Sequence, residues 1–330
     1  MTAYLIVNFG GPRSLAEIEP FLSALLTDRD VVRTYFPRFI NNYLFRKIAK
    51  KRALRITADY KLIGGKSPIY EDTEYIADAL SQKLKAPVLT FHRYLPSTHE
   101  DSLKAIETLQ TKEIRVFPMF PQFTYATTGS IARLFQSKLS VKTLNKLKWV
   151  KSYPSHPAFI RAIQNLIISF LEAHDLNEEE VFFFFSAHGL PKEFIDQGDL
   201  YAYECNLSFE NLISKFQKGE GLLAYQSKFG PGEWLRPYTQ DICEQIEKYH
   251  KGRHHILFVP ISFTSDHIET LFEIEQQYLP IIREQGLLAY RLPALNRQPE
   301  WIEAITDILD PFTPNSNAML IRNQSNSKIR

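Results

Sequence analysis

The sequence predicts an α/β protein whose two halves are each built on a parallel sheet. The main observation is an unbroken apolar run, Val181–Phe185, which is typical of a strand buried on both faces of such a sheet. The chain also opens as an α/β unit does, with a strand, a Gly-Gly-Pro turn and a helix start. Finally, residues 5–12 resemble 183–191, and residues 114–130 resemble 256–270, which indicates two similar halves.

The length and composition agree with two globular domains. A chain of 330 residues, of which 44% are hydrophobic, is long enough to bury two cores. The repeated segments place the two α/β halves near 1–150 and 151–312. Residues 313–330 turn polar, and we expect a loose tail there.

Charge and cysteine content argue against several classes of protein. The 39 Lys and Arg residues nearly balance the 37 Asp and Glu residues, whereas a general nucleic-acid binder shows a strongly basic domain. Cys205 and Cys243 form no zinc or iron–sulfur spacing. The first residues show no basic leader, and no apolar run approaches the ~20 residues of a membrane span. We therefore expect a cytoplasmic protein that at most touches a membrane surface.

Strands and helices alternate along the first half. Its first strand ends in Gly10-Gly11-Pro12, and a later strand ends at His92-Arg93-Tyr94. The strands expected in this half are 3–9, 88–94 and 114–119. The expected helices are 14–26, 72–85, 101–110 and 130–137.

The segment from Arg33 to Arg55 combines aromatic with basic residues. One interpretation is an ordinary amphipathic helix with a solvated basic face. The other is an aromatic lip near residues 35–45 beside a basic rim, which suits a flat, anionic ligand or an anionic lipid surface. The next loop carries Gly64-Gly65 ahead of Ser67, and its backbone N–H groups suit a carboxylate or phosphate, although this signal alone is weak.

In the second half, a histidine follows the central strand. His188 lies just beyond Val181–Phe185, and ligands bind at the carboxyl ends of strands in open α/β sheets. Considered alone, His188 is more simply a buried histidine that is hydrogen-bonded to backbone. The other elements expected here are helices at 158–173, 192–217 and 241–249, strands at 222–226 and 256–259, and a last helix ending near Tyr278.

Three carboxylates, Asp266, Glu269 and Glu273, follow the strand at 256–259 with a spacing that places them on one face of an α-helix. Such a face is either simply solvated or part of a site. A site is favoured because the carboxylates begin in the first turn, where the helix dipole stabilises anions, and because the preceding strand is expected near Val181–Phe185. His188 and Glu269 would then face each other, as a pair that binds a divalent cation or accepts protons. So few ligands make a weak, open site that suits a metal in transit.

Six stretches, in family order, make the chain resemble the ferrochelatase family of class I chelatases. The resemblance implies two Rossmann-like three-layer domains with parallel sheets, as in chelatases. It also implies insertion of Fe²⁺ into a porphyrin late in haem synthesis. The stretches are V-N-F-G-G-P (7–12), Y-K-L-I-G-G-K-S-P-I (60–69), T-T-G-S (127–130), S-A-H-G-L-P (186–191, with Gly198-Asp199 and Tyr201 downstream), Y-Q-S-K-F-G-P-G-E-W-L (225–235) and F-T-S-D-H-I-E-T-L (263–271).

The resemblance also implies roles for individual residues. The catalytic and metal-binding pair falls on His188 and Glu269, with Asp266 and Glu273 as a relay for protons or metal. It leaves open which member of the pair accepts protons and which delivers the metal. The residues expected to contact the porphyrin are Phe9, Arg52, Tyr60, Ser67 and Arg93, the two arginines by meeting propionate groups.

Two departures from the family pattern narrow the expectation. Phe9 stands before Gly-Gly where relatives carry Met, Leu or Tyr, and relatives that use coproporphyrin III tend to carry Tyr. We therefore expect protoporphyrin IX as the substrate and protohaem as the product. Some relatives hold a [2Fe–2S] cluster on four cysteines, but Tyr125 stands where the first is expected and the C-terminal tail has no cysteine. We expect no cluster and no permanently bound cofactor.

Two alternatives to this activity stay open. One is a related chelatase that acts on coproporphyrin III or inserts cobalt into an earlier tetrapyrrole, and the other is a non-catalytic protein that binds a tetrapyrrole or a metal. The expected partners are porphyrin and Fe²⁺, and no nucleic acid. Peripheral contact with the inner face of a membrane, and contact with the preceding enzyme of the haem pathway, are further hypotheses.

Overall fold

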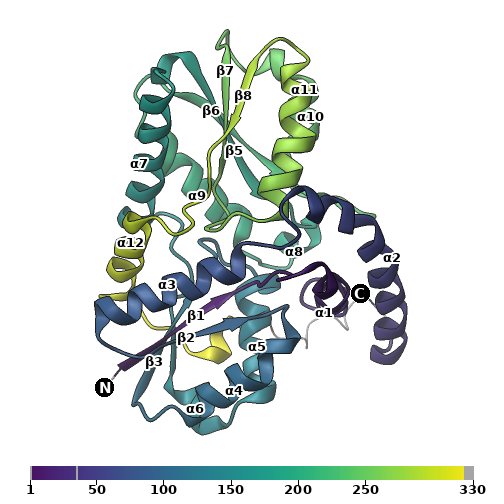
Figure 1. The fold of residues 1–330 in the computed structure, drawn as a ribbon, viewed down its shortest axis with the longest axis vertical. Helices are drawn as coiled ribbons and strands as arrows, with labels where there is room; N and C mark the ends of the chain where they lie inside the picture. Colours follow the sequence, from purple (N-terminus) through teal and green to yellow (C-terminus); the bar gives the residue numbers. More distant parts are fainter. Residues whose placement is uncertain (1, 35, 323–330) are drawn as a thin grey trace. The chain divides into compact units, whose positions relative to one another are not determined.

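The computed structural model describes residues 2–34 and 36–322, and the chain forms two compact units (Figure 1). The first unit contains the residues up to Ser152 together with the described residues from Leu309 onward, and the second is Tyr153–Ile308. The sequence placed the first change of unit near residue 150. It did not predict that the chain returns to the first unit at Leu309.

Each unit is built on a four-stranded parallel sheet, and the two sheets have the same strand order. In the first the order is β2 (Val88–His92), β1 (Thr2–Asn8), β3 (Glu113–Pro118), β4 (Leu147–Trp149). In the second it is β6 (Glu220–Gln226), β5 (Val181–His188), β7 (His255–Pro260), β8 (Leu288–Arg291). The predicted class of two α/β domains with parallel sheets is therefore confirmed.

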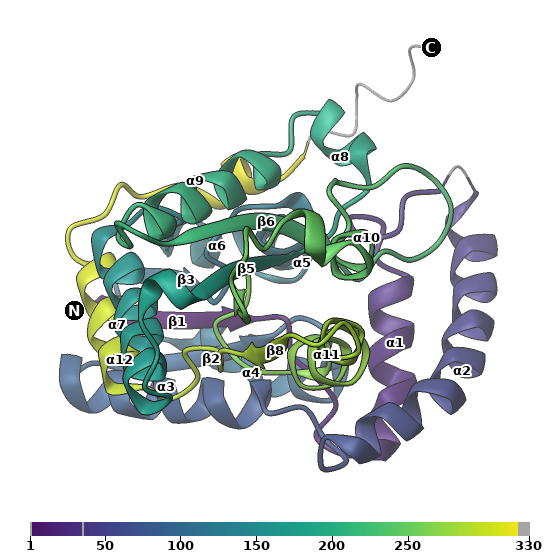
Figure 2. The same ribbon diagram turned by 90° about the horizontal axis from the view of Figure 1, so that it is seen from above.

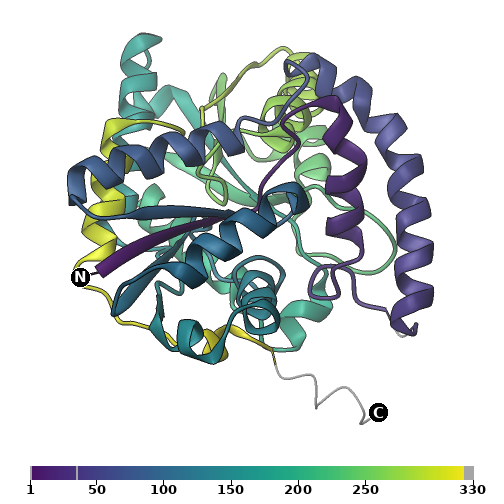
Figure 3. The same ribbon diagram turned by 60° about the horizontal axis from the view of Figure 1, so that its bottom comes forward.

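Helices cover both faces of the first sheet. On one face Leu5 and Val7 pack in a core with residues of α4 and α5, and on the other Asn8 donates a hydrogen bond of 2.9 Å to Thr73 of α3. α1 and α2 lie side by side at one end of this unit (Figures 2 and 3). The helices of this unit are α1 (Ile18–Leu26), α2 (Arg38–Leu62), α3 (Ile69–Leu84), α4 (His99–Thr108), the short π-helix η3 (Tyr125–Gly129), α5 (Ser130–Lys138) and α6 (Val141–Lys146).

In the second unit, the phenylalanines of β5 fill both faces of the sheet. Phe182 and Phe184 pack toward α10, η6 and α11, whereas Phe183 contacts Phe216 on the opposite face. Figure 1 shows α7 on one side of this sheet and α10 and α11 on the other. The helices of this unit are α7 (Pro157–Ala173), α8 (Lys192–Asp196), α9 (Tyr201–Ile213), α10 (Thr239–Glu244), the π-helix η6 (Glu269–Tyr278), α11 (Leu279–Arg283) and α12 (Pro299–Leu309).

The alternation of β5 determines where His188 points. Successive side chains of a strand face opposite sides of a sheet, so His188 shares its side with Phe182 and Phe184. That is the side covered by η6, the helix that begins at Glu269. The sequence of the strand thus directs the imidazole toward the carboxylate.

The predicted loose tail is wrong for the part of it that the structure describes. Asn315 exchanges two backbone hydrogen bonds with Trp149, of 2.9 and 3.0 Å, beside the edge strand β4. Leu320, in the short 3-10 helix η7 (Asn317–Leu320), is fully buried in the core of the first unit. The prediction rested on the polar composition of the whole segment, and composition does not show that a single apolar side chain, Leu320, anchors it. Residues 323–330 lie outside the described part of the chain.

None of the helices in the described residues is long and apolar enough to cross a membrane.

Candidate active site

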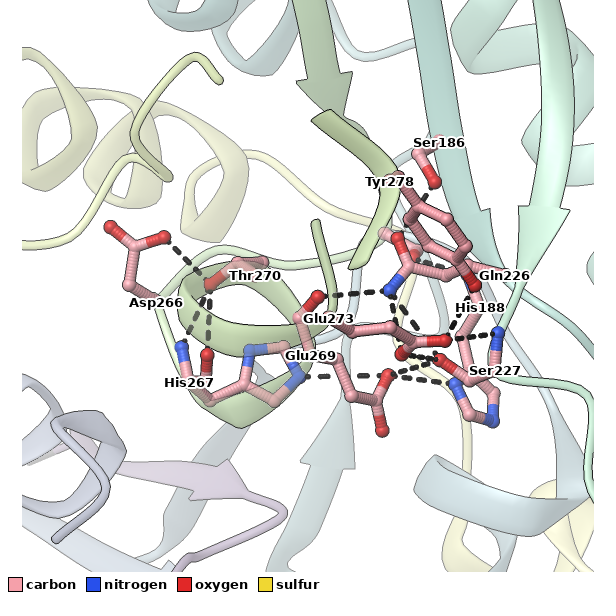
Figure 4. A network of polar contacts seen from close by, with 11 residues as sticks. Ser186, His188, Gln226, Ser227, Asp266, His267, Glu269, Thr270, Glu273 and Tyr278 are labelled. Atoms are coloured by element: carbon pink, nitrogen blue, oxygen red, sulfur yellow. Dashed lines mark hydrogen bonds and ion pairs between the residues drawn. The ribbon is translucent and has the colours of Figure 1, made fainter. Parts of the chain in front are cut away.

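His188 and Glu269 form a close pair in the second unit. The Nδ1 atom of His188 lies 2.8 Å from Oε2 of Glu269 (Figure 4), and both side chains are partly exposed. His188 is the last residue of β5, and Glu269 follows β7. β5 lies between β6 and β7, so the chain adds β6 on one side of β5 and then crosses to add β7 on the other. The point where the strand order reverses in this way is the topological switch point, where open α/β sheets bind their ligands.

Glu269 opens a π-helix of ten residues, η6. At its end, the N–H of Leu279 donates to the carbonyl of Ile274, five positions back. Such helices are rare, usually span a single turn, and occur frequently at functional sites. The helix was predicted, but its wider geometry was not.

Glu273, in the next turn of η6, is surrounded by hydrogen-bond donors (Figure 4). Its Oε1 accepts from the N–H of Ser227 at 2.9 Å and from the hydroxyl of Tyr278 at 2.6 Å. Its Oε2 accepts from the hydroxyl of Ser227 at 2.5 Å and from the amide of Gln226 at 3.2 Å. The same Ser227 hydroxyl lies 3.3 Å from Oε2 of Glu269, so the two carboxylates share one neighbour.

Gln226 and Ser227 come from the end of β6, the strand beside β5. The buried amide of Gln226 donates to the carbonyl of Glu269 at 3.0 Å and accepts from the hydroxyl of Ser186 at 2.7 Å. Ser227 has a φ of 63°, a backbone conformation that is uncommon for a residue other than glycine. This conformation turns both its N–H and its hydroxyl toward Glu273.

Burial and neighbouring charges shift the pKa of His188, Glu269 and Glu273. Burial alone would lower the pKa of His188, but the charge and hydrogen bond of Glu269 outweigh it and raise this pKa. Burial would raise the pKa of Glu269, yet His188 and His267 lower it well below its ordinary value. Burial and the charge of Glu269 raise the pKa of Glu273. The pair thus favours imidazolium with carboxylate, beside a second carboxyl group that keeps its proton to higher pH.

The pair offers two ligands to a metal ion once His188 has lost its proton. Over residues 2–34 and 36–322, no group of three or more His, Cys, Asp or Glu side chains is arranged to hold a metal. A cation on His188 and Glu269 would therefore take its other ligands from water or from a bound substrate, and would be held weakly.

The prediction that Asp266 shares a helical face with Glu269 and Glu273 is wrong. Asp266 precedes η6, and its carboxylate accepts hydrogen bonds at 2.8 Å from three side chains, those of Thr270, Arg291 and Asn296. The error came from applying the α-helical period across a turn.

Sequence comparison agrees with the geometry of the site. A family model for ferrochelatase matches residues 1–311. A curated ferrochelatase of Chlamydia caviae is 46% identical over 309 residues, which cover 94% of this chain and 95% of the relative. One of Chlamydia pneumoniae is 44% identical over 307 residues, covering 93% and 92%.

The chain belongs to the ferrochelatase family. It is accordingly a metal chelatase, a lyase that inserts a metal into a porphyrin. Among solved structures, SirB from Bacillus subtilis with Fe³⁺ superposes with a TM-score of 0.55 at 11% identity, over 93% of this chain and 94% of that one. At this identity the likeness concerns the chelatase fold alone.

In the first unit, two of the porphyrin contacts expected from the ferrochelatase family, Phe9 and Ser67, lie near the end of β1, and a third, Tyr60, lies near the end of α2. Phe9 follows β1 and packs against Tyr94, with ring centroids 4.5 Å apart. Ser67 is buried against Gly11, where an added Cβ would lie 2.5 Å from the serine Cβ. Tyr60 is buried near the end of α2, and its carbonyl accepts from the N–H of Gly65 at 2.7 Å.

The two arginines expected from the ferrochelatase family differ in their surroundings. Arg52 is half-buried on α2, and burial together with the charge of Arg55 lowers its pKa. Arg93 pairs with a carboxylate inside the unit, since its Nη2 lies 2.7 Å from Oδ2 of Asp28 and its Nε 2.7 Å from the hydroxyl of Ser130.

Sequence reasoning assigned no role to Gln226, Ser227 or Tyr278. A signal existed for the first two, because they end a predicted strand that neighbours β5. Tyr278 gave none, since five positions along an α-helix would place it far round from Glu273.

Proposed function

We propose that this chain inserts Fe²⁺ into protoporphyrin IX to form protohaem and releases the two pyrrole protons. Family membership supports metal insertion. The observation that carries the proposal further is the His188–Glu269 pair at the switch point, with Glu273 in the next turn.

The reaction needs acceptors for two protons. Each Fe²⁺ that enters the ring replaces two N–H protons, so the iron–porphyrin product is neutral at its core and two protons leave. Neutral His188 takes a proton from a pyrrole nitrogen, and ionised Glu269 stabilises the imidazolium that forms. Glu273, bridged to Glu269 through Ser227, then passes protons away from the pair.

The same pair also suits delivery of iron. Imidazole and carboxylate oxygen are both ligands for divalent iron, and two protein ligands hold it weakly enough to give it up to four ring nitrogens. A planar ring blocks access to all four nitrogens together, so the proposal includes binding of a distorted porphyrin in preference to a flat one.

Turnover of two variants, compared with one control, tests the roles of His188 and Glu269. His188→Ala should abolish insertion while porphyrin still binds, and Glu269→Gln should lower the rate by roughly 100-fold or more, as expected when an acid–base group is lost. His255→Ala is the matched control. His255 belongs to β7, the strand beside β5, but its ring contacts Tyr290, so this variant should retain full turnover. Unchanged turnover in both pair variants would overturn the proposal.

Substrate choice rests on Phe9, and a direct comparison of porphyrins tests it. The purified chain is assayed with Fe²⁺ and either protoporphyrin IX or coproporphyrin III. A higher kcat/KM with protoporphyrin IX is expected, and an equal or higher value with coproporphyrin III would replace it as the substrate. Porphyrin binding without turnover of either would indicate a non-catalytic tetrapyrrole-binding protein.

Arg52 is proposed to bind a porphyrin propionate. Its guanidinium is half-buried on α2 beside the charge of Arg55, and a guanidinium forms charge-assisted hydrogen bonds with a carboxylate such as a propionate. Arg52→Ala should weaken porphyrin binding by roughly 10- to 150-fold, which corresponds to the ~1.5–3 kcal/mol of a hydrogen bond to a charged group. Lys50→Ala, an exposed neighbour on α2, should leave affinity unchanged. Equal effects of both variants would reduce Arg52 to part of a general basic surface.

We also propose activity without an iron–sulfur cluster. Cys205 and Cys243 are both buried, and burial raises the pKa of each thiol, which disfavours the thiolate that ligates iron. Iron and sulfide analysis of the purified protein tests this, and stoichiometric acid-labile sulfide would contradict it.

The expected aromatic lip includes large exposed side chains in and just before α2. Phe36, Phe39 and Tyr43 are 50%, 74% and 64% exposed, and Lys47 lies over the ring of Tyr43. Tyr35 lies outside the described residues. Exposed rings beside basic side chains support a cytoplasmic protein in peripheral contact with an anionic membrane face. Flotation with anionic liposomes at low salt tests this, and binding of the preceding pathway enzyme without lipid would favour the protein partner instead.

A further inference from the structure

The π-helix η6 needs support from outside itself. Its ten residues exceed the single turn that is usual for this geometry, which is intrinsically less favourable than the α-helix. Both carboxylates of the candidate site, Glu269 and Glu273, depend on its register, because a return to α-helical bonding would turn each later residue about the axis relative to the earlier ones.

Arg291, at the end of β8, contacts both the turn before η6 and the helix itself. Its Nη1 lies 2.8 Å from Oδ1 of Asp266, in the turn before η6, and its Nε lies 2.7 Å from Oε1 of Glu275, inside η6. The arginine side chain is only 10% exposed. One rigid guanidinium thus fixes the distance between the turn and the second half of the helix.

The turn itself is firmly held. Asp266 accepts from the hydroxyl of Thr270 and from the amide of Asn296, both at 2.8 Å, and its own N–H donates to Oδ1 of Asn296 at 2.7 Å. Thr270 is the residue after Glu269. Any strain on the Arg291–Asp266 contact is therefore passed directly to the residue that carries the carboxylate facing His188.

We propose that Arg291 is a positioning residue, which keeps η6 in the π register that presents Glu269 to His188 and Glu273 to Ser227. The inference rests on the metal role proposed above for His188 and Glu269. Arg291 bonds to Asp266, to Glu275 and to the carbonyl of Leu292, so its effect would be on geometry and not on the chemistry of the reacting atoms.

Arg291→Met tests this, because it keeps the apolar stem and removes every donor. Arg283→Met is the matched control: Arg283 binds the carbonyl of Ala289, on the same strand β8, through Nε at 3.2 Å and Nη2 at 2.6 Å. Amide hydrogen exchange over residues 269–278 should accelerate in Arg291→Met and stay unchanged in Arg283→Met. The KM for Fe²⁺ should rise by roughly tenfold, the low end for residues that orient metal ligands, with the KM for porphyrin unchanged.

Two more variants keep the test decisive if Arg291→Met folds poorly. Glu275→Gln weakens only the contact inside η6 and should show the same effects at smaller size. Arg291→Lys keeps the charge but lacks the fork that spans two carboxylates, so it should restore thermal stability without restoring the KM for Fe²⁺. Normal exchange and a normal KM for Fe²⁺ in folded Arg291→Met and Glu275→Gln would overturn the proposal. That result would leave the proposed function intact, whereas full turnover of His188→Ala and Glu269→Gln would remove the function itself.

Discussion

The hydroxyl of Tyr278 lies 2.6 Å from Oε1 of Glu273, although the two residues are five positions apart in one helix. In an α-helix such residues would be separated by about 140° around the axis. The wider turn of η6 brings them together, so the surroundings of Glu273 depend directly on the π geometry.

Tyr278→Phe should lower turnover a few-fold and destabilise the protein by about 1 kcal/mol, the usual net value of one hydrogen bond. The phenol stabilises the ionised form of Glu273, so its loss raises the pKa of that group further. Urea unfolding and steady-state kinetics measure both effects. Tyr290→Phe, which removes a hydroxyl 3.3 Å from Nδ1 of His255, is the control, and it should keep normal turnover.

The rate should depend on pH through His188. Insertion requires the neutral imidazole, and the charge of Glu269 raises its pKa, so the acid limb of kcat/KM should lie above the ordinary histidine value of about 6.5. In Glu269→Gln this charge is absent and burial lowers the pKa, so the limb of the residual activity should move to lower pH. Rates between pH 5 and pH 9 locate the acid limb in both proteins. A limb at the same pH in both would mean that the charge of Glu269 does not control the pKa of His188.

Stability should follow the same charges with a definite sign. The folded-state pKa of His188 is raised, so its contribution is complete below about pH 6.5 and is lost as pH rises through the folded value. The folded-state pKa of Glu269 is lowered, so its contribution is present above about pH 4.5 and is lost in acid. His188→Gln should therefore destabilise the protein more at pH 6 than at pH 8.5, as measured by urea unfolding.

Two substitutions at Ser227 separate backbone strain from hydrogen bonding. Ser227→Gly and Ser227→Ala both remove the hydroxyl near Glu269 and Glu273, but only glycine adopts a φ of 63° without penalty. The glycine variant should be the more stable by about 1 kcal/mol, while both show the same loss of turnover. Equal stability would mean that the positive φ carries little strain.

Leu320 should be essential to the first unit. Leu320→Ala empties part of a fully buried position in the core with Trp149 and Phe135, and should destabilise the protein by about 2–5 kcal/mol. Met319→Ala, at a neighbouring side chain that is 68% exposed, should change stability by less than about 0.5 kcal/mol. Thermal or urea unfolding compares them, and similar small losses would return residues 313–322 to the status of a loose tail.

The sequence predicted the central strands of both sheets and missed their fourth strands. β1, β5 and β7 carry apolar runs of four residues or more, which is typical of strands covered by helices on both faces, and β3, which follows a predicted helix, contains Val116 and Phe117. β4 and β8 have three and four residues, too few for a pattern to appear, and each is added at the edge of a sheet that is already formed.

The His188–Glu269 pair was predictable for a topological reason. Both residues follow strands that any parallel sheet of this order places side by side, so their contact depends on the fold more than on local detail. Asp266 and Tyr278 depend instead on where a turn stops and how wide a helix is. The energies that decide those features are small, and they come from contacts such as Arg291 with Asp266 that are distant in sequence.

The return of the chain to the first unit affects the order of events on the ribosome. Domains generally fold as they emerge, starting from the N-terminus, but the segment that pairs with Trp149 and buries Leu320 is translated after the whole of the second unit. The second unit, whose residues are contiguous, can finish first. The first unit, although most of it is synthesised before the second, completes its packing only after the second unit has been translated.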